Sequence, residues 1–438
     1  MNSGSMGLSH DFASDMTTRT RPRPRYRVPA LGLWVALAGT SWALAGVQAP
    51  ADPVAPPPYR AAYVPSEDGE LLQQVPAATD PQVRQMRLLR ATLGKDQGSL
   101  ATAEQLAQVY IDFGRQLGDA HYAGYAEAVL RPWLMQAAPP AAVLVDYATI
   151  LQYRHQFDEA RQQLKRALAA QPGSGQAWLT LATIDMVQGD YPAATHDCSQ
   201  VAAGGGFQLG IACVGNLRSY LGQAKQSLAL LGQLQGYRAG SSPAYQAWIE
   251  GLLAEVCERL GDWTQAESHY RKALGFTPAD NFLQVAFADF LLDRGRPKEV
   301  LTLLRDSSQS DTAFLRLALA KASLHSADVQ LYTWIMAARF EALAARGSDY
   351  FGREQVRFAL YLQHNPQAAL DLATRNWQVQ RAPWDLRVLL EAADAAHQPQ
   401  AAWPALRFLH ETRLEDPVIA TLASRLESQL PDHGARAP

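Results

Sequence analysis

Apolar and small residues recur along most of the chain at the three- and four-residue spacing that places them on one face of a helix. One particular spacing of apolar and small residues before a proline occurs twice along the chain. The two stretches are Ala160, Leu164, Ala167, Leu168 and Pro172, and then Ala266, Tyr270, Ala273, Leu274 and Pro278. A pattern of this length that returns further along the chain is typical of repeat proteins. We therefore expect successive units, each made of two antiparallel helices.

Four units stand out, in two pairs whose members begin 34 residues apart: 141 and 175, then 247 and 281. Small residues stand where the two helices of a unit would touch: Ala148, Ala182, Ala254 and Ala288 on the first helices, and Ala160, Ala194 and Ala266 on the second. Between the helices stand Gly189, Gly261 and Gly295, where a turn with positive φ is expected. Prolines then end the second helices.

These residues closely resemble the tetratricopeptide repeat, whose consensus places Trp, Leu-Gly, Tyr, Ala, Phe and Pro at these intervals. The resemblance implies an all-α fold, a right-handed α-solenoid of helix-turn-helix repeats. The stretch 357–396 also resembles the end of exported bacterial tetratricopeptide proteins of unassigned role. We expect about nine helix pairs between residues 100 and 430, since an array grows by adding units.

The expected organisation divides the chain as follows: 1–15 a leader foreign to the native protein, 16–49 a signal peptide or membrane anchor, 50–99 a proline-rich linker and short helix, 100–310 the repeat array (units 141–174, 175–207, 247–280 and 281–310), 311–430 degenerate repeats, 431–438 a tail. Leu317-Ala318, Phe358-Ala359 and Ala392-Ala393 are expected to open first helices in the degenerate part. The amphipathic stretch 417–429 fits a terminal cap.

The N-terminal region reads as an export signal. Five arginines, at alternate positions from Arg19 to Arg27, precede the uncharged run 28–47, and small residues follow at Ala43-Leu44-Ala45. We expect cleavage there. Twenty uncharged residues also suffice to cross a bilayer, so an uncleaved anchor in the inner membrane is the alternative. Either outcome places the body of the chain in the periplasm.

Composition and charge exclude several functions. The 39 basic and 42 acidic residues give a net charge of −3, which disfavours nucleic acid because phosphate binding needs a concentrated positive field. The histidines are scattered, so neither a metal nor a cofactor is predicted. His196, Asp197 and Cys198 are consecutive and would point about 100° apart on a helix, so they do not form a catalytic triad. We therefore expect no enzymatic activity.

The cysteines suggest one disulfide. Cys198 falls on the second helix of the 175 unit, and Cys213 on the first helix of the next unit. Neighbouring helices of a solenoid bring such residues together, and an oxidising compartment favours their bridging. The alternative is two small buried thiols. Cys257 occupies an apolar position and is expected in the core.

The resemblance implies that first helices line a concave groove in which a partner peptide lies. The positions that it selects are Val145, Thr149, Gln152, Tyr153, Leu179, Thr183, Met186, Asn216, Tyr220, Trp248, Glu255, Glu258, Asp289 and Asp293. The early groove would be apolar to neutral and the later groove acidic. Acidic walls attract basic partners, so we expect a positively charged or apolar segment, with a merely solvated acidic face as the alternative.

The resulting hypothesis is a non-catalytic scaffold that binds protein or peptide partners in the bacterial cell envelope. The alternative is an accessory subunit of a machine that assembles envelope polysaccharide or peptidoglycan, in contact with glycan. Trp248, at a groove position, is the residue that would contact a sugar. Trp178 and Trp263 fall on positions where packing is expected.

Overall fold

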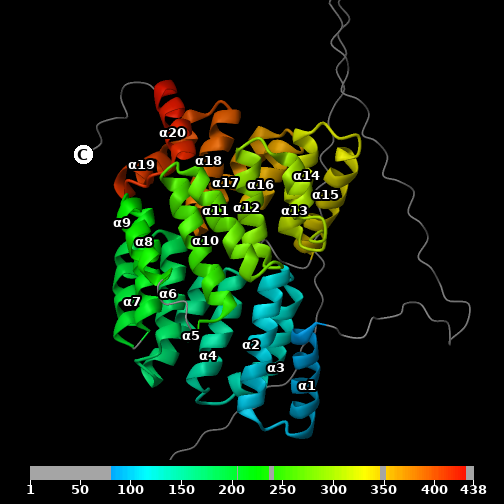
Figure 1. Cartoon of the computed structure of the whole chain (residues 1–438), viewed down its shortest axis with the longest axis vertical. Helices are drawn as coiled ribbons and strands as arrows, with labels where there is room; N and C mark the ends of the chain where they lie inside the picture. The colour runs from blue at the N-terminus through cyan, green and yellow to red at the C-terminus, as the bar shows by residue number, and fades with distance from the viewer. Residues whose placement is uncertain (1–79, 205, 236–240, 346–351, 431–438) are drawn as a thin grey trace, which may run out of the picture. The chain divides into compact units, whose positions relative to one another are not determined.

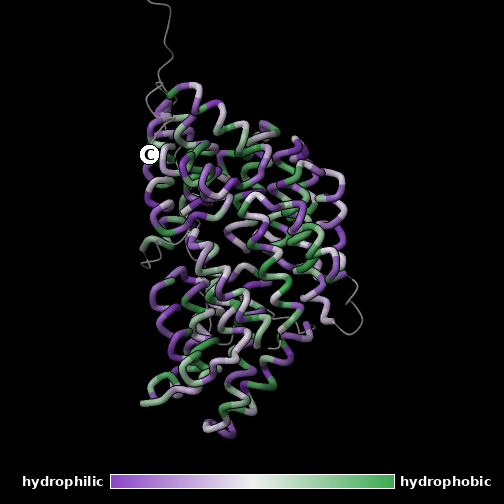
Figure 2. The backbone as a smooth tube through the Cα atoms, turned by 90° about the vertical axis from the view of Figure 1, so that its left-hand side faces the viewer, coloured by the Kyte–Doolittle hydropathy of each residue, from purple (hydrophilic) through white to green (hydrophobic). Residues whose placement is uncertain are grey.

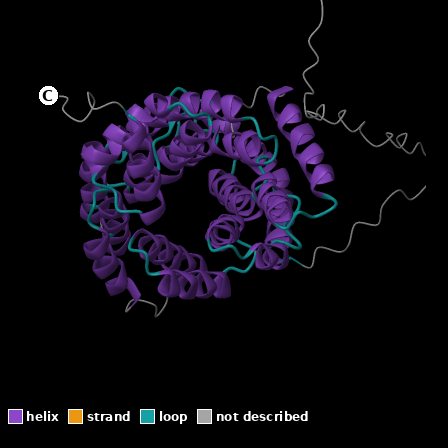
Figure 3. Cartoon of the chain, turned by 90° about the horizontal axis from the view of Figure 1, so that it is seen from above, coloured by secondary structure: helices purple, strands orange, loops and turns teal. Residues whose placement is uncertain are grey.

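The computed structural model describes residues 80–204, 206–235, 241–345 and 352–430. They form twenty α-helices and one short 3₁₀ helix, and no strand (Figure 3). The first ten helices are α1 Pro81–Lys95, α2 Leu100–Leu117, α3 His121–Leu134, α4 Ala141–Tyr153, α5 Phe157–Ala170, α6 Gly175–Gln188, α7 Tyr191–Ala203, α8 Phe207–Tyr220, α9 Ala224–Leu234 and α10 Pro243–Arg259.

The remaining helices follow the same alternation as far as the C-terminal cap (Figure 1). They are α11 Trp263–Phe276, α12 Asn281–Asp293, α13 Pro297–Leu303, α14 Asp311–Ser323, α15 Val329–Ala345, α16 Gly352–Tyr361, α17 Pro366–Val379, α18 Pro383–Ala395, η2 Pro399–Ala402, α19 Trp403–Thr412 and α20 Pro417–Gln429. From α2 to α19 the described helices form nine helix-turn-helix pairs, and α20 follows them. The predicted all-α solenoid of paired helices is confirmed.

Small residues lie where the sequence pattern placed them. All seven alanines predicted at helix contacts have 0% of their surface exposed. Hydrophobic and hydrophilic stretches alternate along single helices (Figure 2), as helices with one buried face require. The core is accordingly a series of small clusters between successive helices, such as the one that joins Leu144, Leu164 and Leu181. Each pair is thus stabilised mainly by its neighbours.

The turns within pairs use two kinds of residue. Gly189, Gly261 and Gly295 have φ values of 77°, 72° and 67°, as the sequence predicted. Histidine takes the corresponding place in other units: His155, His325, His364 and His397 have φ between 52° and 57°. Histidine is among the few residue types enriched in this left-handed region. The downstream repeats therefore keep the turn although glycine is absent from it.

Helices 14, 16 and 18 contain the three residue pairs expected to open first helices downstream, and α20 spans the expected cap. Helices distant in sequence also meet. Arg115 of α2 lies 3.3 Å from Asp280, which caps α12. Arg381, after α17, donates its backbone N–H to the Val187 carbonyl of α6 at 2.7 Å. Later units thus pack against earlier ones within the described array.

The expected leader, export signal and proline-rich linker lie outside the described residues, as does the tail. Among the helices that the structure describes, none combines the length and apolar character needed to span a bilayer.

Candidate functional sites: the inner face and a cavity beside α6

The inner face of the later units, lined by first helices, is occupied by buried ion pairs. Asp289 of α12 accepts hydrogen bonds from Arg316 of α14, at 2.7 and 3.0 Å, and from Arg357 of α16, at 2.7 Å. Arg316 also bonds to Glu354 of α16. Although burial raises the pKa of Asp289, these two guanidinium groups outweigh it and hold that pKa below its ordinary value. Three successive first helices are thereby joined.

A second pairing reaches further along the array. Arg387 of α18 donates to both carboxylate oxygens of Asp293, at 2.6 and 2.8 Å, and to Glu391 of its own helix. Asp293 and Arg387 are 94 residues apart. Such two-bond arginine–carboxylate contacts fix geometry as well as charge. The inner face therefore closes between α12 and α18.

The remaining acidic groove candidates are also engaged within the chain. Glu255 pairs with Arg259 at 3.4 Å, and the Arg259 guanidinium lies 4.8 Å from the centre of the Tyr220 ring. Glu258 accepts a hydrogen bond from the Tyr270 hydroxyl. Burial, above all, raises the pKa of Glu258 to about 8. This carboxyl group is therefore protonated at neutral pH.

These contacts correct the expectation of an open acidic groove in the later units. Asp289, Asp293, Glu255 and Glu258 lie on first helices as predicted, but their charges are neutralised by arginines or by a proton. Asn216 also faces the chain itself, since its amide nitrogen lies 3.9 Å from the Met186 sulfur. Trp248 is half-buried beside Tyr245, with ring centres 6.1 Å apart.

The first units keep an accessible inner face. Tyr153 is 40% exposed, and Leu179, Thr149, Gln152 and Thr183 are half-buried. The two threonine hydroxyls donate to carbonyls of their own helices, at 3.0 and 2.8 Å. By contrast, Val145 and Met186 are buried. The accessible candidates are thus uncharged, as expected for the early groove.

Three carboxylates that the sequence interpretation did not select stand beside them. Asp146 of α4 faces Glu104 and Asp112 of α2, and no carboxylate of the three forms an ion pair with another described residue. Burial first, and then these two neighbours, raise the pKa of Asp146 to about 7. One of its oxygens is buried without a hydrogen-bond partner in the described part of the chain. Arg115 partly opposes the effect of burial on the pKa of Asp112, but the early units still hold three neighbouring carboxyl groups without ion pairs to described residues.

A cavity of about 800 Å³ lies on the other side of α6. Helices 5, 6 and 7 form most of it, and residues 378–381 close one end, held by the backbone bond between Arg381 and Val187. Its lining residues are Arg161, Lys165, Leu168, Trp178, Leu181, Asp185, Gln188, Asp190, Ala193, His196, Asp197, Gln378, Val379 and Arg381. The volume suits a small ligand or one or two side chains.

The sequence interpretation missed this cavity because its walls form only when α5 packs against the next unit and residues 378–381, from a distant unit, close one end. Arg161 and Asp185 are 24 residues apart and meet only through repeat stacking. His196 and Asp197 do share the cavity wall although they are consecutive, whereas Cys198 turns away into a disulfide. Within the described ranges no three His, Cys, Asp or Glu side chains cluster as metal ligands.

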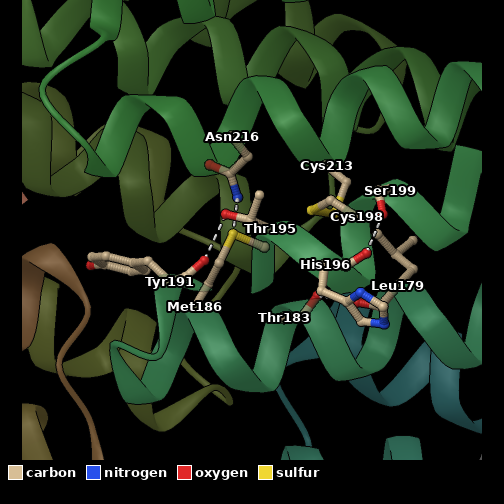
Figure 4. Close-up of a disulfide and its surroundings, with 10 residues drawn as sticks. All are labelled: Leu179, Thr183, Met186, Tyr191, Thr195, His196, Cys198, Ser199, Cys213 and Asn216. Carbon is tan, nitrogen blue, oxygen red and sulfur yellow. Dashed lines mark hydrogen bonds between the residues drawn. A yellow bond between two sulfur atoms is a disulfide. The ribbon is translucent and has the colours of Figure 1, made fainter. Parts of the chain in front are cut away.

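Cys198 and Cys213 are joined in the structure by a disulfide across α7 and α8, with Cα atoms 5.4 Å apart (Figure 4). Both residues are buried. The bridge links α7 covalently to α8, the first helix of the following unit. Cys257 is a free buried thiol, in the core as expected.

Comparison with known proteins supports a repeat architecture for part of the array. Residues 151–196 match the tetratricopeptide repeat. This segment runs from the end of α4 into α7 and therefore includes most of the cavity wall. No curated protein matched the chain.

Several solved structures are similar to the chain at 12% identity. In the APC/C hetero-tetramer Cut9–Hcn1, the match covers 79% of this chain and 52% of that chain, with a TM-score of 0.38; the chain thus spans about half of that relative's length. The match to a tetratricopeptide repeat protein from Parabacteroides merdae covers 63% of this chain and 99% of that chain, with a TM-score of 0.38. The match to yeast Tom70 covers 80% of this chain and 92% of that chain, with a TM-score of 0.34.

The disulfide yields a first testable prediction. Peptide mapping of unreduced protein should recover Cys198 and Cys213 in one linked pair and alkylated Cys257 alone. Replacing both bridged cysteines by alanine should lower the free energy of unfolding by about 3 kcal/mol, because the bridge closes a loop of 15 residues. Alkylation of all three thiols in unreduced protein would contradict the bridge.

Glu258 yields a second prediction. Its pKa is about 8 in the folded chain against an ordinary 4.5, so the folded state holds this proton more tightly than the unfolded state. The free energy of unfolding should therefore fall as pH rises from 4.5 to 8, and Glu258→Gln should reduce that fall by about 4 kcal/mol. Urea unfolding at several pH values measures it. The exposed Glu411→Gln is the control, and equal pH profiles for both variants would refute the assignment.

Proposed function

We propose that the protein is a non-catalytic helical-repeat scaffold that binds a basic or apolar segment of a partner protein. The binding surface is the inner face of α2, α4 and α6. Repeat arrays present extended surfaces of this kind, and the match of residues 151–196 to a tetratricopeptide repeat supports the assignment.

One observation carries the proposal: carboxylates of the later inner face are paired within the chain, whereas Glu104, Asp112 and Asp146 are not. Burial first, and then repulsion from Glu104 and Asp112, raise the pKa of Asp146. A cationic group placed among them would relieve that repulsion and satisfy the unpartnered oxygen of Asp146. The exposed ring of Tyr153, about two helical turns beyond Asp146 on α4, adds an apolar contact of the kind enriched in protein interfaces.

We further propose that binding takes place in the cell envelope after export. The arginines and uncharged run before residue 48 support export. The Cys198–Cys213 disulfide is consistent with an oxidising compartment. Residues 16–49 would then serve as a cleaved signal or as an anchor.

The test is photo-crosslinking in intact cells from two tyrosine positions. A benzophenone amino acid at Tyr153, on the inner face, should capture a protein in the envelope fraction. The same probe at Tyr125, which is 49% exposed on the second helix α3, is the matched control and should not. Captured chains are identified by mass spectrometry.

Charge neutralisation sharpens this test. The triple variant Glu104→Gln, Asp112→Asn, Asp146→Asn should reduce capture at Tyr153 about tenfold, and high salt should act similarly. Neutralising the paired Glu299 and the exposed Glu411 and Glu427 instead should leave it unchanged. Capture from the cytosol alone contradicts export. Equal capture at Tyr125, or recovery of glycan alone, contradicts the proposed partner class.

A further inference from the structure

The floor of the cavity beside α6 is a set of hydrogen-bonded polar groups. Arg161 bonds to Asp185 through two nitrogens and to Gln188 through a third. Its positive charge is therefore used to neutralise Asp185, whose side chain is only 6% exposed. Asp197, from α7, is buried next to this pair.

Asp197 differs from Asp185 in its proton affinity. Burial first, and then the hydrogen bond and charge of Asp185, raise the pKa of Asp197, while Arg161 opposes them; the resulting value is about 7. The groups that face it are Arg161 from α5, Asp185 from α6 and Asp190 from the start of α7. At pH 6 the Asp197 carboxyl group is thus largely neutral and donates a hydrogen bond to Asp185, and near pH 7 it is about half ionised.

The cavity walls carry cations that lack carboxylate partners. Lys165 and Arg381 face the cavity from opposite elements, and neither forms an ion pair with a described residue. The guanidinium group of Arg381 donates to the Trp377 carbonyl, at 3.4 Å. With Asp197 protonated, the lining contains three permanent cations, Arg161 being the third, against two carboxylates, Asp185 and Asp190. The difference, 3 − 2, is one positive charge.

The remaining lining combines polar side chains with an apolar surface. Trp178 is half-buried and fixed by a hydrogen bond from its ring nitrogen to the Pro172 carbonyl, at 2.9 Å, and His196 meets it edge-on. Leu168, Leu181 and Val379 extend this surface. An apolar surface beside placed charged groups suits a ligand that has both an apolar body and a charged group.

We propose that this cavity binds a monocarboxylate that carries an apolar or aromatic body, either a free organic acid or the C-terminal residue of a peptide. The carboxylate lies between Lys165 and Arg381, and the body lies against Trp178. A single excess positive charge matches a monoanion better than a phosphate dianion. The site is independent of the inner face proposed above, since it lies on the opposite side of α6.

Ligand binding should be linked to a proton. When Asp197 ionises, the excess charge of the lining falls to zero and the new negative charge repels the ligand. Affinity should then weaken about tenfold between pH 6 and pH 8, in proportion to the protonated fraction of Asp197. His196 lines the same cavity next to Asp197, so a variant must separate the contributions of the two residues.

Isothermal titration of the full, disulfide-bonded chain tests the site with three probes: N-acetylphenylalanine, phenylacetate and the uncharged amide of N-acetylphenylalanine. At least one of the two acids, N-acetylphenylalanine or phenylacetate, should bind at pH 6 with a dissociation constant of about 1 mM or tighter. The amide should bind at least tenfold more weakly. Preference for the first assigns a peptide end, and preference for phenylacetate assigns a free acid.

Four variants complete the experiment. Lys165→Met, at an exposed position that does not support the fold, should weaken acid binding about fivefold, whereas the exposed Lys272→Met should not change it. Asp197→Asn should abolish the loss of affinity between pH 6 and 8, and His196→Gln should retain it. The proposal is overturned if neither acid binds by 10 mM (about ten times the expected constant), if amide and acid bind equally, if both lysine variants behave alike, or if the pH dependence follows His196.

Discussion

Pairing between arginines and buried carboxylates on successive first helices is the interaction on which this structure depends. Asp289 contacts Arg316 and Arg357, which lie on two further helices of the inner face. Asp293 contacts Arg387. A carboxylate so buried would be costly if it were unpaired. The guanidinium fork contacts two carboxylates at once, which an ammonium group does less well. The excess of 33 arginines over 6 lysines has at least part of its explanation here.

This pairing decides where a ligand has access. Because α12, α14, α16 and α18 are joined through their inner faces, accessible surface remains on α2, α4 and α6. The packing of later units against earlier ones also brings residues 378–381 over α6, where the Arg381–Val187 bond closes the cavity. The two surfaces that we propose to bind ligands, on opposite sides of α6, thus follow from one arrangement of repeats.

The sequence predicted what depends on neighbours in the chain. The 34-residue interval, the buried alanines and the glycine turns each express local helix packing, and the contact of Cys198 with Cys213 follows from adjacent helices. It placed Asp289 and Asp293 on first helices correctly, but helical spacing gives only the direction of a side chain. Their arginine partners lie one, two or three units later, at positions set by small rotations accumulated between units.

Two other features escaped prediction for different reasons. The turns at His155 and His364 were hidden because glycine is the usual signal for positive φ, and histidine is a less frequent substitute. The acidic trio near Asp146 draws two members from α2, in a unit whose match to the repeat is weak. Its significance rests on the absence of ion pairs between these carboxyl groups and other described residues. That absence can be seen only in the packed structure.

The closure of the later inner face is tested most directly by a double-mutant cycle on Asp293 and Arg387, measured by urea unfolding. Their side chains form two hydrogen bonds across 94 residues of sequence. Asp293→Asn and Arg387→Gln should each destabilise the fold, and the double variant should reveal a coupling energy of about 1–3 kcal/mol. Additive effects within about 0.5 kcal/mol would show that α12 and α18 do not meet, and would contradict the account.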